Sequence, residues 1–135
     1  MKKIRSSKKG FTLAELLIVV AIIGVLVGIS IPIFTSQLEK SREATDAANI
    51  RAAKAAAVSA YLSEDKIGSK QLGSQQTDDV TLGYDAVNGV LTESVVDGYG
   101  KGTTAGAVNE DNAGKGISIK VTKAGNVTLT WASST

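Results

Sequence analysis

Hydrophobic and polar residues are distributed unevenly along this chain of 135 residues. The stretch KKGFTLAELLIVVAIIGVLVGISIPIF, residues 8–34, is almost entirely apolar after its two lysines, and residues 16–29 include no polar side chain. A helix needs about 20 apolar residues to cross a hydrocarbon core of roughly 30 Å. The pattern therefore predicts a helix over residues 11–38 that lies in a membrane or packs among other copies.

From residue 36 the chain becomes polar but still favours a helix, because it is rich in alanine and has no glycine or proline before Gly68. Opposite charges recur at helical spacing, in the pairs Glu39–Arg42 and Arg42–Asp46. Small and apolar residues form two neighbouring stripes, one of Ile50, Ala53, Ala57 and Tyr61 and one of Ala48, Ala55, Val58 and Leu62. We expect one stripe to face a C-terminal sheet and the other a neighbouring subunit.

After residue 62 the pattern changes to short strands and turns. Residues 63–81 are polar and predict a loop, residues 82–87 a strand, and Asn88-Gly89 a hairpin turn. Residues 90–96 are ambiguous between strand and helix, and the glycine-rich residues 98–116 predict an exposed loop. Alternating apolar residues predict a terminal hairpin of strands 117–122 and 126–131, on which Trp131 caps the core.

These elements predict an α+β fold in which a long N-terminal helix packs on a small antiparallel β-sheet. The expected segments are a leader at 1–10, an apolar helix at 11–38, an amphipathic continuation at 39–62 and a loop and sheet region at 63–135. The joined helix of residues 11–62 would be ~78 Å long. So long a helix is unsuited to a compact monomer.

Charge and composition narrow the range of functions that the sequence allows. The formal net charge is +2, but residues 1–10 carry five basic side chains, and without them ten basic side chains face thirteen acidic ones. The mildly acidic remainder argues against nucleic acid as the main ligand. The chain has no Cys and no His, and no catalytic constellation is visible, so we expect neither an enzyme nor a cofactor.

Glu15 is the one acid in the apolar stretch. A charge in hydrocarbon costs roughly 2.5–3.5 kcal/mol on insertion scales, so this carboxylate needs a partner. Cleavage between Gly10 and Phe11 would create an α-amine four residues before Glu15, on the same helix face. The amine could then neutralise Glu15 of its own chain or of a neighbouring subunit.

The residues KKG-FTLAELL resemble the processing motif of type IV pilins and pseudopilins, over roughly the first 60 residues of the chain. The resemblance implies that a prepilin peptidase cleaves after Gly10 and methylates the amine of Phe11, and that Glu15 is the glutamate required for assembly. It also implies that residues 24–32, with Gly24, Gly28 and Pro32, lose helical order inside a filament. Many members close their C-terminal region with a disulfide, which a chain without Cys lacks.

The resemblance further implies a structural subunit that polymerises into a type IV pilus. Its partners would be other copies of itself, the prepilin peptidase, an assembly platform and the cytoplasmic membrane, which it leaves for an extracellular filament. Adhesion and twitching motility follow only from the family. The alternatives are a pseudopilin of a type II secretion or competence system and a monomeric membrane-anchored binding protein with an uncut N-terminus. A secretory signal peptide and a plain membrane anchor also remain open for the N-terminal segment.

Two further motifs have plainer interpretations. Acids in the C-terminal half suggest a calcium site; they are Asp78, Asp79, Asp85, Asp97, Glu110 and Asp111. No stretch among them has EF-hand spacing, and we predict no metal site. The cluster of residues 109–112 is expected to be a solvated loop. Residues 126–128, Asn-Val-Thr, form an N-glycosylation sequon that we attribute to chance.

Overall fold

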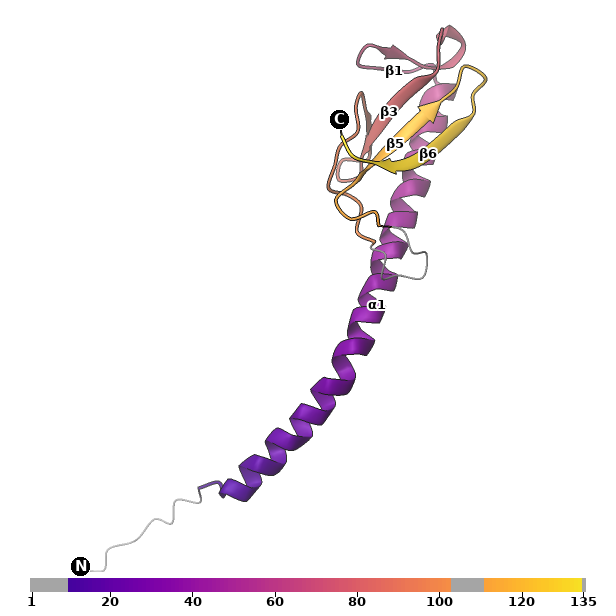
Figure 1. Ribbon diagram of the computed structural model, residues 1–135. Helices are drawn as coiled ribbons and strands as arrows, with labels where there is room; N and C mark the ends of the chain where they lie inside the picture. The colour runs from indigo at the N-terminus through magenta and orange to yellow at the C-terminus, as the bar shows by residue number, and fades with distance from the viewer. Residues whose placement is uncertain (1–9, 103–110, 135) are drawn as a thin grey trace, which may run out of the picture. The chain divides into compact units, whose positions relative to one another are not determined.

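The computed structural model describes residues 10–102 and 111–134 (Figure 1). The predicted leader up to residue 9 and the middle of the glycine-rich segment, including Asn109 and Glu110, lie outside the described residues. The chain divides into two compact units, one ending at Ser36 and the other beginning at Gln37. Each unit is described by itself.

The predicted long helix is confirmed as α1, Leu13–Leu62, which runs through both units. Its C-terminal end is a Schellman motif, in which Asp65 N donates to Ala60 O and Glu64 N to Tyr61 O. Glu64 has the left-handed φ of 57° that this motif requires at the residue after the cap. The polar run 63–65 therefore ends the helix where its apolar stripe ends.

The second unit contains a four-stranded antiparallel sheet with the order β4-β3-β5-β6 (Figure 1). Its strands are β3 (Val80–Asp85), β4 (Val90–Thr92), β5 (Gly116–Val121) and β6 (Val127–Ala132). The hairpin turn at Asn88-Gly89 is confirmed, with Gly89 at a φ of 70°. The terminal hairpin is confirmed as β5 and β6, which pair over six residues without a bulge.

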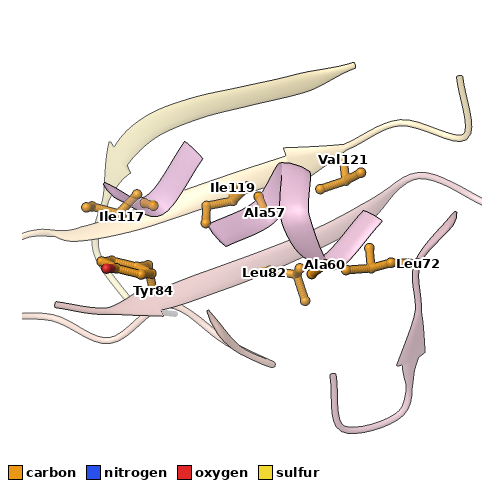
Figure 2. Close-up of a cluster of buried hydrophobic side chains, with 9 residues drawn as sticks. Ala57, Ala60, Leu72, Leu82, Tyr84, Ile117, Ile119 and Val121 are labelled. Carbon is orange, nitrogen blue, oxygen red and sulfur yellow. The ribbon is translucent and has the colours of Figure 1, made fainter. Parts of the chain in front are cut away.

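The core of this unit lies between α1 and one face of the sheet. Ala53, Ala57 and Ala60 of the helix are buried against larger side chains from the sheet and its connections, namely Leu72, Leu82, Tyr84, Ile117, Ile119 and Val121 (Figure 2). The small alanine side chains let the helix approach the sheet closely, and the larger side chains of the sheet fill most of the core. Of the two predicted stripes, the one with Ala53 and Ala57 faces the sheet, and Ile50 and Tyr61 are partly buried at its ends. Trp131 is partly buried against the same core, as predicted.

Two loop predictions were wrong in part. The expected loop at 63–81 contains two paired two-residue strands, β1 (Lys66–Ile67) and β2 (Lys70–Gln71), a 3-10 turn, η1 (Gly73–Gln75), and the start of β3. Pairs this short leave no periodic pattern in the sequence. The ambiguous residues 90–96 form a strand only as far as Thr92.

The described parts of the glycine-rich segment, residues 98–102 and 111–116, are also less exposed than predicted. Gly98 N donates to Gly114 O at 2.8 Å, Gly100 N to Lys115 O at 2.8 Å and Asn112 N to Gly102 O at 3.0 Å. Gly100 and Gly102 are buried. A Cβ added to Gly100 would lie 1.7 Å from Asn112 O, so glycine here permits two backbone segments to approach each other.

Candidate functional site

The junction between Gly10 and Phe11 lies just before the helix begins. No heavy atom lies within 4 Å of a Cβ added to Gly10, and Phe11 is 85% exposed. The peptide bond at which we predict cleavage therefore has no close neighbour among the described residues.

Thr12 and Glu15 form a capping box at the start of α1. Glu15 N donates to Thr12 Oγ1 at 3.1 Å, and Thr12 N donates to Glu15 Oε2 at 3.0 Å. Two backbone donors that a helix N-terminus leaves without partners are thereby satisfied reciprocally. This box explains why the helix begins at Leu13 rather than at the predicted residue 11.

The capping box also gives Glu15 a partner that the sequence analysis missed. The carboxylate accepts a backbone N–H and lies in the first turn, where the helix macrodipole favours negative charge. The pattern Thr-x-x-Glu before an apolar run is the known signature of this motif and could have revealed it. Only one carboxylate oxygen is used by Thr12 N, so the other remains available for a cation.

The apolar part of α1 presents its large side chains on every side. All large hydrophobic residues from Phe11 to Phe34 are between 47% and 85% exposed in the chain taken alone. The helix is long and apolar enough to cross a membrane, judged by length and composition. Because isolated proteins rarely leave so large an apolar surface in water, this surface requires a partner.

Gly24, Gly28 and Pro32 lie on this same exposed helix. An added Cβ at either glycine meets no heavy atom within 4 Å, so no contact among residues 10–102 and 111–134 requires a small side chain there. Pro32 lies inside the helix and has no N–H, which leaves the carbonyl of Gly28 without its usual donor. Ser30 Oγ donates to Leu26 O at 2.7 Å, one turn before the proline.

In the second unit, Asp46 fixes α1 to the glycine-rich segment. Its buried carboxylate accepts Lys101 N at 2.8 Å and Gly102 N at 2.7 Å. Of the predicted charge pairs, Glu39–Arg42 is formed at 3.4 Å, whereas Asp46 takes these two amides. The partners lie 55 and 56 residues away in sequence, so no local pattern could have indicated them.

Two of the C-terminal acids, Asp85 and Asp97, accept several hydrogen bonds each. Within residues 10–102 and 111–134, no three acidic groups are close enough to hold a metal ion. Asp85 accepts Tyr99 Oη at 2.6 Å, Asn88 Nδ2 at 2.6 Å and Val87 N at 2.9 Å. The Tyr99 hydroxyl, followed by Asn88, lowers the pKa of Asp85 from 3.8 to about 2, and the same bond raises the pKa of Tyr99.

Asp97 and Ser134 form a clasp at the end of the chain. Ser134 N donates to Asp97 Oδ1 at 2.8 Å, and the Ser134 hydroxyl also bonds this carboxylate. These hydrogen bonds lower the pKa of Asp97. The clasp closes the C-terminal region without a disulfide.

Residues 5–31 match a family model described as the prokaryotic N-terminal methylation motif. The chain is 36% identical over 105 residues to a fimbrial protein of Pseudomonas aeruginosa, covering 78% of this chain and 63% of that one. It is 30% identical over 129 residues to the type IV major fimbrial protein FimA of Dichelobacter nodosus, covering 82% and 79%. A type IV major alpha-pilin of Moraxella bovis is 43% identical over 61 residues.

The chain thus spans less than two thirds of the first of these relatives. No solved structure matches it significantly. The match to the methylation motif covers the capping box and the apolar part of α1. The longer matches to FimA and to the Pseudomonas protein extend into the second unit.

Proposed function

This chain belongs to the type IV pilin family, and we propose that it is a structural subunit of a pilus and not an enzyme. A prepilin peptidase cleaves it after Gly10 and methylates the amine of Phe11, and the mature chains polymerise into a filament. Before assembly it spans the cytoplasmic membrane once, and an assembly platform there then extracts it to the cell surface. The relatives named as major pilins favour a pilus over the alternative of a pseudopilin.

The observation that carries this proposal is the exposed apolar surface of α1. Apolar area removed from water contributes roughly 25 cal/mol per Å², so side chains 47–85% exposed in the chain alone need an apolar environment. A bilayer supplies it before assembly, and the same surfaces of other copies supply it in a filament. A membrane-anchored monomer would use only the first of these.

The capping box explains how Glu15 can have a partner both in the membrane before cleavage and in the filament after it. Cleavage after Gly10 leaves the peptide bond between Phe11 and Thr12 intact, so Thr12 N can still bond Glu15. The new amine of Phe11 would then pair with the second carboxylate oxygen, in its own chain or a neighbour. A buried pair of this kind sets the register between subunits more than it adds stability.

The first experiment is the mass of the N-terminal peptide of protein sheared from the cell surface. A peptide that begins at Phe11 and carries one added methyl group is the expected result. An intact residue 1–10 segment, or cleavage near residue 30, would contradict the proposal and favour an anchor or a secreted domain. Protein released by shear must come from a polymer, because a membrane-anchored monomer stays with the cells.

Two variants of Glu15 separate its charge from its capping role. Glu15→Gln keeps an acceptor for Thr12 N, since glutamine also completes a capping box, but removes the charge. Glu15→Ala removes both. We expect both variants to be processed and neither to enter filaments at the wild-type yield. Glu15→Gln subunits incorporated normally would show that assembly needs only the cap.

We also propose that residues 24–32 unwind on assembly. The continuous helix around Pro32 already lacks one backbone hydrogen bond, so this segment costs least to extend. Amide hydrogen exchange in intact filaments should be faster over residues 24–32 than over residues 14–22. Uniformly slow exchange along the helix would contradict this.

A further inference from the structure

β6 is the outer strand of the sheet on one side, and its own six residues lack the charge, proline and bulge that commonly protect an edge (Figure 1). Natural edge strands are shortened, bulged, charged or interrupted by proline. The opposite edge, β4, has three residues and is followed by Glu93, which bonds Ser69. β6 has six residues, Val-Thr-Leu-Thr-Trp-Ala, with no charge, no proline and no bulge.

The outward backbone groups of β6 can be identified from the hairpin. Thr122 N donates to Asn126 O at 2.9 Å, so the backbone of Asn126 points toward β5. Successive residues of a strand point to opposite edges, so the amides and carbonyls of Val127, Leu129 and Trp131 point away from β5. No residue that the structure describes hydrogen-bonds to these groups.

We propose that β6 is a docking edge for β6 of a second copy of this chain, paired antiparallel about Leu129. Residues opposite each other in a ladder have side chains on the same face of the sheet. Within β6, only Val127, Leu129 and Trp131 have backbone amides and carbonyls that point away from β5. Pairing Leu129 with its own counterpart, and Val127 with Trp131 of the second copy, uses all three residues and makes about six hydrogen bonds. If the two strands instead paired about Thr130, Val127 would have no apolar residue opposite it.

Side chains and charge fit this register. Thr128 and Thr130 are exposed on the sheet face away from the core and would lie opposite each other, a pairing that stabilises sheets. Exposed Lys123 lies in the hairpin turn before the strand, and exposed Asp97 is bonded to Ser134 just after the strand ends. In an antiparallel pair these opposite charges approach each other across the two copies.

This contact goes beyond polymerisation through α1 and does not depend on it. It would join copies through their sheets about a two-fold axis, as between two filaments that lie side by side and run in opposite directions. Its test therefore uses full-length chain in detergent, where filaments are not required.

The chain contains no Cys, so introduced cysteines report the register directly. Full-length Thr128→Cys and Thr130→Cys chains, mixed and mildly oxidised, should form a disulfide dimer. The matched control mixes Thr128→Cys with Thr81→Cys. Thr81 is exposed on β3, two strands in from β6, and Lys120 of β5 lies between Thr81 and Thr128. We expect ~10-fold more dimer in the first mixture, since opposed Cβ atoms lie ~5 Å apart. Equal yields would overturn the proposal.

Charge variants test the same register without a disulfide. Thr128→Lys with Thr130→Lys places like charges opposite each other, whereas Thr128→Lys with Thr130→Glu places opposite charges there. Sedimentation of the full-length chains in detergent should show loss of dimer in the first double variant and dimer retained in the second. A monomeric wild type, or the same dimer fraction in both variants, would overturn the proposal. Circular dichroism confirms that each variant is folded.

Discussion

The two halves of α1 are stabilised in opposite ways. Up to Ser36 the helix bears large apolar side chains, all of them exposed in the chain taken alone, whereas from Gln37 onward its buried apolar residues are three alanines. The second half has a sheet that provides large residues, so small ones suffice on the helix. The first half has no such partner within the described chain, and its large residues must be covered from outside.

The difference shows that helix propensity and helix burial are separate properties. Both halves are helical in the chain alone, yet only the second contributes to a core. A change that leaves the helix intact can therefore destabilise one half and only weaken external contacts in the other. The same substitution made in the apolar half of the helix and in the sheet that packs on the other half tests this directly.

The largest expected effect comes from truncating isoleucine in each region. Ile119 is fully buried against the helix, so Ile119→Ala should destabilise the C-terminal unit by about 2–5 kcal/mol. Ile23 is 53% exposed, so Ile23→Ala should change the same unfolding transition by less than about 0.5 kcal/mol. Urea unfolding of full-length chain in detergent, followed by Trp131 fluorescence, measures both. Equal losses would show that the two regions share one core.

Asp46 tests what holds the helix to the glycine-rich segment. Asp46→Asn replaces one accepting oxygen with an NH2 group that faces a backbone donor, and bonds to charged groups are worth about 1.5–3 kcal/mol. We expect a loss of that size, with faster hydrogen exchange at Lys101 and Gly102. Unchanged exchange at these two amides would contradict the anchoring role.

The alanine face offers a smaller test. Ala57 is fully buried, so Ala57→Leu should overpack the contact between α1 and the sheet and cost about 1–3 kcal/mol. Ala55 is exposed on the neighbouring stripe, so Ala55→Leu should have little effect on stability. If thermal unfolding were lowered equally by both, the sheet-facing stripe would have been assigned to the wrong side of the helix.

The smallest effect is a pH dependence confined to the second unit. The pKa of Asp85 is lowered to about 2 by Tyr99, so its stabilising contribution is complete above about pH 4 and is lost as the pH falls through about 2. Tyr99→Phe should lower the Tm at pH 6, and the gap to wild type should narrow toward pH 2. A gap that stays constant over this range would contradict the role of the Asp85–Tyr99 bond.

The sequence was sufficient for features that repeat along it. Period and composition predicted α1 and two candidate stripes on it, without deciding which is buried, and turn residues predicted the two hairpins. The capping box of Thr12 and Glu15 was also present as a local pattern. The clasp of Asp97 and the anchor of Asp46 were not predictable, because each joins residues far apart in sequence. The glycine-rich packing depends on backbone segments whose approach no residue pattern encodes.

The clasp between Asp97 and Ser134 has a consequence for where the chain can mature. A disulfide at this position would need an oxidant and would form over seconds to hours. Hydrogen bonds to a carboxylate need neither, so the C-terminal region can close in a reducing compartment or under anaerobic growth as soon as the sheet forms. Its closure depends on proton concentration instead of redox potential, and it reopens without enzymatic help.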